Sequence, residues 1–397
     1  MKRNKVLTVA SLFSGCGGFD LGFLQAGFRC VGAFDIDPLV VDVYRTNLKS
    51  PATICDLSSD SLDTEALSNL DVLLSGSPCQ GFSTAGKRNI NDPRNDLLMA
   101  AGRIARTFLP RVFIAENVSG VRSGPHRKYW DALNCMLVDA GYRTADLVCE
   151  GTKMGVPQIR RRAILLAWRT KKDTEVTIPI LKGGTTRSAL GSIEEHPNHL
   201  VQVLPSNSDL DRIAKRIKCG QKLSNVRGGP RAVHTWDIPE VFGKTTREER
   251  ILLEAIMRLR RQCRSRQTGD ADPVQIRLLR KSIGGPVREL LLKLKHKGYV
   301  RLDGPFCDLV HTFNGKFRRL HLDYPSPTVD TRFGDPRYFL HPTENRGLTV
   351  REAARIQGFP HSFVFDGPER AQYRMVGNAV PPPLANCLAR FVADALI

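Results

Sequence analysis

The cysteine at position 79 has a setting that suits a nucleophile. It lies between Pro78 and Gln80, directly after an apolar run at 71–75 that predicts a β-strand. The polar loop that follows carries Lys87 and Arg88, and nearby positive charge lowers the pKa of a thiol and favours the reactive thiolate. To about residue 95 this loop has few apolar anchors, which is typical of a segment that closes over a site. A lone cysteine is more often a small buried hydrophobic residue, so both interpretations stay open at this point.

A glycine-rich turn at 13–18 could bring the backbone close to a ligand, because glycine has no side chain to prevent the approach. Asp35 ends the next predicted strand, twenty residues after Gly15, and a carboxylate there can bind both hydroxyls of a ribose. The alternative is that Asp35 or Asp37 caps the following helix. The turn departs from the dinucleotide spacing GxGxxG, and alone it indicates only a nucleotide of some kind.

A carboxyl group and an arginine run belong to two later predicted strands. Glu116 ends the strand predicted at 111–116, and a buried carboxyl group can be held protonated to act as an acid. Gln158, Arg160 and Arg162 alternate before a predicted strand at 163–168, so an extended backbone would project them to one face. Two guanidiniums placed together suit a phosphate or a base carbonyl. The alternatives are a helix-capping Glu116 and a solvated basic run.

The elements that must position these residues alternate between strand and helix over the first 170 residues. Further strands are predicted at 6–13, 29–34 and 52–55, and helices at 19–26, from 37 onward, and at 96–108. This alternation predicts an α/β fold with a parallel sheet covered on both faces. Ligands of such sheets bind beyond the carboxyl ends of the strands. The residues at or just past those ends, which we therefore expect at one edge, are Gly15, Asp35, Asp56, Cys79 and Glu116.

The alternation is lost after about residue 175. Residues 244–320 carry 19 Lys and Arg against 8 Asp and Glu. Apolar residues at helical spacing predict helices at 248–260 and 286–297, and a glycine turn with a short strand follows at 298–302. This order predicts a winged-helix DNA-binding unit within 244–302, with a solvated basic helical insertion as the alternative. The last segment predicts a helix at 349–357, a turn at 377–379 and an apolar helix after Pro381.

Charge and cysteine content narrow the classes of function. The net charge of +19 indicates a polyanionic partner, and nucleic acid is the natural one. No stretch approaches 18 uncharged apolar residues, so we predict no membrane span and no membrane partner. The ten cysteines form no CxxC pair, which predicts neither a metal site nor a disulfide framework. Such cysteines are typical of a reduced compartment, and we expect a cytoplasmic protein.

Six short motifs occur in an order that resembles the cytosine-5 DNA methyltransferase family. They are Phe-x-Gly-x-Gly-Gly at 13–18, Pro-Cys-Gln at 78–80, Glu-Asn-Val at 116–118, Gln-x-Arg-x-Arg at 158–162, Arg-Glu-Ala-Ala-Arg-Ile-Gln-Gly-Phe-Pro at 351–360 and Gly-Asn-Ala-Val at 377–380. Each motif alone is weak, but their order and spacing together indicate the family. The resemblance omits most of 175–315, which in this family is the variable target-recognition region.

The resemblance implies an α/β fold with a Rossmann-like, S-adenosylmethionine-dependent methyltransferase sheet and a smaller, irregular target-recognition domain. It implies a catalytic and cofactor-binding domain at 1–175. A variable recognition domain at 176–345 would follow, and the motifs at 346–397 would return to the catalytic domain.

The resemblance also implies roles for the matching residues. Cys79 would attack carbon 6 of the cytosine, Glu116 would hold and protonate N3, and Arg160 and Arg162 would brace the base carbonyl and the catalytic loop. Ile36 replaces an aromatic residue of several family members, so stacking on the adenine would be weaker. The expected cofactor contacts are Phe13, Gly15, Cys16, Gly17, Gly18, Asp35, Ile36, Asp56, Leu57, Pro78, Leu97 and Asn378, and the expected DNA contacts are Gln80, Ser83, Lys87, Arg88 and Gln158.

The implied partner is double-stranded DNA, from which the target cytosine would be flipped out. We expect a nucleoid-associated monomer in a restriction–modification or regulatory role, with a cognate endonuclease as a candidate partner and no metal requirement. An RNA-modifying member of the family is an alternative, but its Cys-Phe-Thr tripeptide is absent from this sequence. A non-catalytic DNA-binding protein would be expected to lose the nucleophile or the acid. A nucleotide-dependent oxidoreductase would need a closer match to GxGxxG.

Overall fold

The computed structural model describes residues 6–58, 67–78, 96–170, 175–193, 195–265 and 271–397. The chain divides into two compact units. Unit 1 runs to Leu200 and also contains 323–332 and 349–397, whereas unit 2 contains 201–322 and 333–348. The chain thus leaves unit 1 later than the expected boundary at 175, and it returns twice, at Asp323 and at Thr349.

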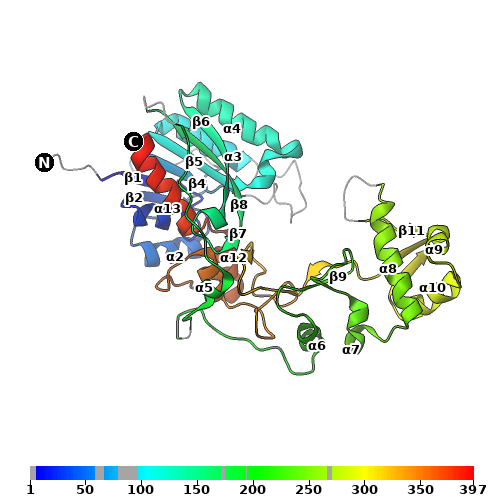
Figure 1. The fold of residues 1–397 in the computed structure, drawn as a ribbon. Coiled ribbons are helices and arrows are strands. Elements are labelled where there is room, and N and C mark those ends of the chain that lie inside the picture. Colours follow the sequence, from blue (N-terminus) through cyan, green and yellow to red (C-terminus); the bar gives the residue numbers. More distant parts are fainter. Residues whose placement is uncertain (1–5, 59–66, 79–95, 171–174, 194, 266–270) are drawn as a thin grey trace. The chain divides into compact units, whose positions relative to one another are not determined.

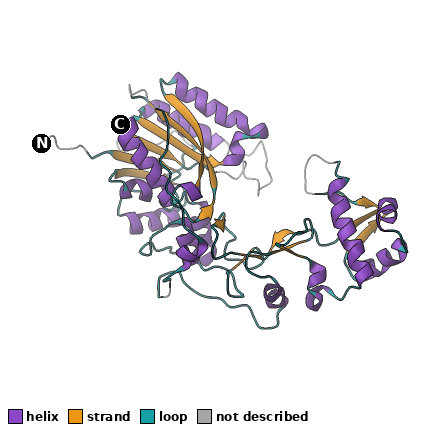
Figure 2. Cartoon of the chain, in the orientation of Figure 1, coloured by secondary structure: helices purple, strands orange, loops and turns teal. Residues whose placement is uncertain are grey.

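Unit 1 is built on a seven-stranded sheet, shown with its helices in Figures 1 and 2. The strand order is β3-β2-β1-β4-β5-β8-β6. The pairs among β1 to β5 are parallel, as predicted, whereas β8 is antiparallel to both β5 and β6. The strands are β1 (Thr8–Leu12), β2 (Arg29–Asp35), β3 (Thr53–Ile54), β4 (Val72–Ser75), β5 (Val112–Val118), β6 (Arg143–Glu150) and β8 (Arg161–Trp168).

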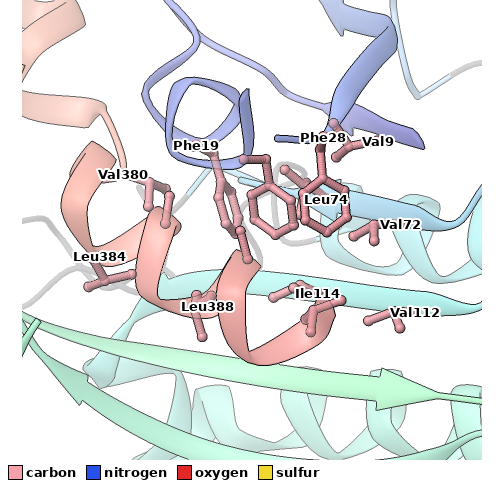
Figure 3. Packing of buried hydrophobic residues seen from close by; sticks show 14 of the residues in the cluster. Val9, Phe19, Phe28, Val72, Leu74, Val112, Ile114, Val380, Leu384 and Leu388 are labelled. Carbon is pink, nitrogen blue, oxygen red and sulfur yellow. The ribbon is translucent and has the colours of Figure 1, made fainter. Parts of the chain in front are cut away.

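Helices cover both faces of this sheet because its strands are apolar on both sides. One core cluster contains Val9 and Ile114, and residues of α1 and α13 pack against them (Figure 3). The other contains Ala10 and Phe113, which pack with α3 and α4. The helices of unit 1 are α1 (Gly18–Gln25), α2 (Pro38–Leu48), α3 (Asp96–Phe108), α4 (Arg127–Asp139), α5 (Thr186–Leu190), α11 (Val350–Gln357), α12 (Glu369–Asn378) and α13 (Pro382–Phe391), the last followed by a π-helical turn at Val392–Leu396.

Helix α13 brings the C-terminal segment back against α1, which follows the first strand. The two helices approach so closely at Gly22 that a Cβ there would lie 2.4 Å from the Cβ of Ala385. At Gly18 a Cβ would lie 2.4 Å from the carbonyl oxygen of Val380. Both glycines are therefore required by packing, and the contact places the 377–380 motif beside the glycine-rich turn.

Several predicted elements differ from the observed ones. The predicted turn at 377–379 is wrong, because Gly377 and Asn378 form the last residues of α12. The sequence reading did not predict α4 or β6. A short strand, β7 (Gln158–Ile159), pairs in parallel with β16 (Ser326–Pro327), and Arg160 lies between β7 and β8.

Unit 2 contains two hydrophobic clusters. One lies among short strands and helices, and the other lies among three longer helices and a small sheet. The elements of the first region are α6 (Asp209–Arg216), β9 (Lys222–Ser224), β10 (Ala232–Val233), α7 (Pro239–Phe242), β14 (Asn314–Lys316), β15 (Arg318–Arg319) and β17 (Phe339–Leu340). The second region, which we call the helical lobe (247–309), contains α8 (Arg247–Gln262), β11 (Val274–Gln275), α9 (Ile276–Ile283), α10 (Val287–His296), β12 (Val300–Asp303) and β13 (Phe306–Leu309).

Candidate functional site

Unit 1 contains a cavity of about 320 Å³ at the carboxyl ends of its parallel strands. The ends of β1, β2, β4 and β5 all contribute to its walls, which is where a parallel sheet places its ligands. Residues 374–380, at the end of α12 and just beyond, complete the lining. Most of the residues expected at one edge of the sheet are therefore brought together.

The glycine-rich turn forms one wall of the cavity. Phe13 turns the chain out of β1 with a φ of 54°, a left-handed conformation that is uncommon for a bulky residue. Gly15 follows with a φ of 56°, and its N–H donates to Oδ2 of Asp35 at 2.9 Å. The other oxygen of Asp35 accepts from the N–H of Asp37 at 3.1 Å. Asp35 therefore holds the turn, and the capping alternative applies to Asp37, whose Oδ1 accepts from Leu39 N–H at the start of α2.

Eleven of the twelve residues expected to contact the cofactor line the cavity. The exception is Gly17, the N-cap of α1, whose φ of 93° and contact with Tyr44 give it a conformational role. A Cβ at this position would lie 2.7 Å from the Tyr44 ring. The lining residues among those expected are Phe13, Gly15, Cys16, Gly18, Asp35, Ile36, Asp56, Leu57, Pro78, Leu97 and Asn378.

Glu116 and Arg162 meet on a second wall of the cavity. Glu116 lies on β5 and Arg162 on the antiparallel neighbour β8, and Nε of Arg162 is 2.6 Å from Oε1 of Glu116. Both side chains are largely buried, with 10% and 12% of their surfaces exposed. The guanidinium therefore fixes the direction in which the carboxyl group points, and the sheet pairing fixes the guanidinium.

Asn117 follows Glu116 on β5, and it connects this strand to the segment that leads to position 79. Its Nδ2 lies 3.3 Å from the carbonyl oxygen of Ser77, to which it donates, and its Oδ1 accepts from the N–H of Val118 at 2.9 Å. Pro78, the next residue along the chain, lines the cavity. No separate role is predicted for Asn117 from the sequence, although it stands at the centre of the Glu-Asn-Val tripeptide. Cys79 and the expected DNA contacts Gln80, Ser83, Lys87 and Arg88 lie outside the described residues.

Two other cysteines line the cavity, and neither environment favours a thiolate. Cys16 is 2% exposed, and burial raises the pKa of its thiol to about 12. Burial and, after it, the negative charge of Asp56 raise the pKa of the Cys55 thiol. Both residues are therefore thiols at neutral pH, with low nucleophilicity.

Arg160 braces the structure around the cavity from inside the protein. Its guanidinium is 1% exposed and donates to three carbonyl oxygens, those of Val329, Gly377 and Ala379, at 3.0, 3.2 and 3.0 Å. These acceptors belong to two segments that the chain reaches only after passing through unit 2. Arg160 lines the cavity, but the observed bonds indicate that it holds the walls together.

Gln158 takes part in the same bracing, and its position does not support the expected DNA contact. The residue is completely buried, its Oε1 accepts from the N–H of Val329 at 3.1 Å, and its Nε2 donates to the side chain of Gln357. Gln357 in turn donates to the carbonyl oxygens of Val376 and Ala379 at 2.8 and 2.9 Å. Burial alternates along this segment, with Gln158 and Arg160 buried and Ile159 and Arg161 exposed, and the two buried side chains make bracing bonds whereas Arg162 pairs with Glu116.

The motif at 351–360 also has an architectural role. Arg351, on α11, is completely buried and donates to the carbonyl oxygens of Pro197 and Phe363, both at 2.7 Å. Burial lowers the pKa of its guanidinium to about 10. Thr349, just before the motif, and Glu352 form a capping box at the start of the helix. The motif thus helps to start its helix through Glu352 and attaches that helix to the rest of unit 1 through Arg351.

A buried carboxyl group lies on α1, the helix that follows the glycine-rich turn. Asp20 has no exposed surface, and Cys30 Sγ lies 3.9 Å from its Oδ1, toward which the thiol donates. The Tyr44 hydroxyl lies 3.1 Å from the same sulfur. Burial raises the pKa of Asp20 to about 6, so this carboxyl group titrates near neutral pH.

Neither a metal site nor a membrane span is found in the parts of the chain that the structure describes. Within those ranges, no three His, Cys, Asp or Glu side chains are grouped so that they could hold a metal ion. Every helix described is too short or too polar to cross a membrane.

Comparison with known proteins agrees with the geometry of the cavity. The model of the C-5 cytosine-specific DNA methylases matches residues 7–393. The Type II methyltransferase M.XorII of Xanthomonas oryzae pv. oryzae is 30% identical, over 97% of this chain and 84% of that protein. M.DdeI of Desulfomicrobium norvegicum is 27% identical, over 98% and 88%.

Two solved structures show the same fold. One is a putative DNA modification methyltransferase encoded within an E. coli prophage, with a TM-score of 0.59, 22% identity and coverage of 98% of this chain and 99% of that one. The other is the S. pombe Dnmt2 methyltransferase, with a TM-score of 0.53, 16% identity and coverage of 99% of both chains. The family match extends over nearly the whole sequence, and the cavity lies where an α/β enzyme places its active site. The chain therefore belongs to the C-5 cytosine-specific DNA methylases and is a DNA (cytosine-5-)-methyltransferase.

Proposed function

We propose that this enzyme transfers a methyl group from S-adenosylmethionine to carbon 5 of a cytosine flipped out of double-stranded DNA, through a covalent adduct with Cys79. One observation carries the proposal: the glycine-rich turn with Asp35, the Glu116–Arg162 pair and Pro78 all line a single cavity. The residues expected to bind the cofactor and the carboxyl group expected to act as the acid thus face the same space. Pro78, the residue before Cys79, lines this space as well.

The residues of the cavity fit S-adenosylmethionine. Asp35 stands at the end of β2, where a carboxylate can accept hydrogen bonds from ribose hydroxyls. Ile36, Leu57 and Leu97 offer apolar surface to an adenine ring. A Cβ at Gly15 would have no atom within 4 Å, so the turn leaves open space beside its backbone. When bound, S-adenosylmethionine supplies a methyl group activated by its sulfonium.

The protein's own groups would make the cytosine reactive. Carbon 5 of cytosine is a weak nucleophile, and addition of the Cys79 thiolate to carbon 6 converts the ring to an enamine. Glu116 would hold N3 and supply its proton as the sulfur adds, while Arg162 keeps the carboxyl group aimed into the cavity. After carbon 5 has been methylated, a base removes its proton, the C6–S bond breaks so that the thiolate leaves, and N3 returns its proton to the Glu116 carboxylate.

The reaction requires the target base to leave the duplex, at a cost of roughly a few kcal/mol. Contacts between basic side chains and phosphates can offset this cost. The net charge of +19 supports such contacts. The similarity to Type II methyltransferases supports a sequence-specific restriction–modification role for this chain. A cognate endonuclease and a monomeric enzyme are part of the same proposal.

The test compares Cys79→Ser with Cys135→Ser, which removes an exposed thiol on α4. Each protein is incubated with methyl-labelled cofactor and with separate pools of duplex DNA and RNA. We expect label in DNA for the wild type and for Cys135→Ser. We expect none for Cys79→Ser, although that variant should still bind S-adenosylhomocysteine. Near-normal turnover by Cys79→Ser would refute the mechanism, and label in RNA alone would refute the substrate.

A second experiment tests the covalent step directly. DNA that contains 5-fluorocytosine should trap the wild-type enzyme as a denaturant-resistant adduct, because fluorine at carbon 5 cannot be removed as the hydrogen is. Peptide mapping should find the adduct on Cys79. Bisulfite sequencing of DNA from cells that express the chain then identifies the target sequence.

A further inference from the structure

The helical lobe has the element order helix, strand, helix, helix, strand, strand, from α8 through β11, α9, α10 and β12 to β13. Its sheet has the order β11-β13-β12, and both pairs are antiparallel. The first short strand thus pairs with the last strand of the β12–β13 hairpin. This is the topology of a winged-helix unit, in which a helix–turn–helix is followed by a hairpin.

The turn between α9 and α10 fits a helix–turn–helix. Three residues, Gly284, Gly285 and Pro286, separate the two helices. Both glycines have a positive φ, of 66° and 70°, and such short glycine-containing turns are typical of the motif. The second helix of a helix–turn–helix is the one that enters the major groove of DNA. In this lobe that helix is α10.

The lobe is held together by its own core and by buried ion pairs. Trp236, Leu252, Leu291 and Leu294 belong to one buried cluster that joins α8 to α10. Asp308, on β13, pairs with the buried Arg260 of α8 at 2.5 Å and with Arg301 of β12 at 2.6 Å. The ion pairs therefore connect α8 to the hairpin, and α8, α9 and α10 lie close together in Figure 1.

Helix α10 is amphipathic, with a basic outer face. Val287, Leu291 and Leu294 face the core of the lobe. Arg288, Leu292 and Lys295 recur at spacings of four and three residues, which places them on one side of the helix. All three are exposed, and Leu292 keeps 54% of its surface exposed. We call these three residues the α10 face.

The two cations of the α10 face differ from their neighbours in having no acidic partner. Lys293 is paired with Glu289 at 2.6 Å, and Lys297 with Glu249 at 2.8 Å. Among the described residues neither Arg288 nor Lys295 forms an ion pair. Their charges are thus available to a polyanion, and an exposed leucine between them suits contact with a thymine methyl group.

We propose that the helical lobe is a winged-helix unit and that the α10 face lies in the major groove of the DNA that the enzyme methylates. This inference rests on the proposed function for the identity of the substrate, and it adds the surface that the substrate contacts in unit 2. Arg288 and Lys295 contact phosphates or guanine edges, and Leu292 lies between them against the base edges. Asp303 ends β12, and the hairpin turn at 304–305 consists of Gly and Pro, so its tip adds no positive charge.

The test measures the affinity of the full-length protein for a duplex that contains its methylation sequence, by fluorescence anisotropy at several salt concentrations. The variant is Arg288→Gln with Lys295→Gln. The control is Arg227→Gln with Arg261→Gln, which removes the same charge from two exposed arginines of unit 2 outside α10. Thermal unfolding midpoints check that both variants are folded.

We expect the α10 variant to bind DNA at least about tenfold more weakly, and the slope of log affinity against log salt to fall by up to about 2. The control should change the affinity less than threefold. The inference is overturned if the α10 variant loses less than tenfold, or if the control loses as much as the α10 variant. The same comparison on a duplex of mixed sequence separates the two proposals, because a wild type that labels no cytosine would refute the proposed function while this binding comparison stays valid.

Discussion

Two arginines, one in each unit, have opposite environments. Arg160, in unit 1, is 1% exposed and donates to three backbone carbonyl oxygens. Arg288, in the helical lobe of unit 2, is exposed and is not among the arginines that form ion pairs in the described structure. The sequence shows both only as basic residues, whereas the structure shows that one braces the protein from inside and that the other has its side chain exposed.

The difference shows that a count of basic residues overestimates the number of cations that are available to bind DNA. Arg160 and Arg351 hold unit 1 together through carbonyl oxygens, and Arg319 does the same in unit 2 by donating to Ile217 and His341. A planar guanidinium with five donors suits this bracing, because one side chain can satisfy several carbonyl groups. Arg288 and Lys295 on α10, by contrast, form no ion pair among the described residues.

The largest effect is expected on the rate of methylation when Glu116 is replaced. Glu116→Gln removes the carboxyl group that would protonate N3 while keeping the shape of the side chain. Loss of such a general acid lowers the rate by about a hundredfold to ten-thousandfold. Single-turnover methylation measures the loss, and calorimetric binding of S-adenosylhomocysteine should be nearly unchanged. A variant with normal turnover would show that Glu116 is not the acid.

A large loss of stability is expected when the buried arginine is replaced. Arg160→Met keeps the volume but removes a donor from three carbonyl oxygens, of which that of Ala379 keeps its bond from Gln357, and each unmet buried group costs about 1–3 kcal/mol. We expect a total loss of about 4 kcal/mol in the free energy of unfolding, measured by urea denaturation. The adjacent Arg161 is exposed, so Arg161→Met is the matched control and should change stability little. Equal losses in the two variants would contradict the bracing role.

The buried carboxyl group of Asp20 should make the stability of unit 1 depend on pH. Its pKa of about 6 in the folded protein lies above the ordinary 3.8, so the unfolded chain releases this proton first as pH rises. Stability is therefore lost between about pH 4 and pH 6, and the full cost, about 3 kcal/mol, applies above that range.

Asp20→Asn, which cannot ionise, should be more stable than the wild type by about 3 kcal/mol at pH 8 and by about half as much at pH 5. Chemical denaturation at the two pH values measures this change. A difference between the two proteins that is the same at pH 5 and pH 8 would show that Asp20 does not titrate in this range.

The smallest effect is expected on the stability of the protein when Arg288 of the α10 face is replaced. Arg288→Gln breaks no ion pair of the described structure, so the free energy of unfolding should change by less than about 0.5 kcal/mol. Thermal denaturation measures this, and the same variant should bind DNA more weakly. A loss of stability larger than 1 kcal/mol would show that Arg288 serves the fold, as Arg160 does, and the contrast between the two arginines would disappear.

Much of unit 1 could be predicted because its signals are local. Strand and helix periodicity predicted β1, β2, β4, α3 and α11, and the strand ends predicted which residues would meet at one edge of the sheet. Local patterns did not predict α4 and β6, nor the antiparallel direction of β8, because strand direction depends on how the chain returns to the sheet.

The sequence by itself determined the family, through six motifs in order, and most of the cavity lining, because parallel strands bring their carboxyl ends together. It did not determine the roles of Gln158, Arg160 and Asn117. Their partners are up to 219 residues away along the chain, and only the folded structure brings them within hydrogen-bonding distance. The same holds for α10: periodicity predicted an amphipathic helix with basic residues, but only tertiary packing decided which of its cations form ion pairs.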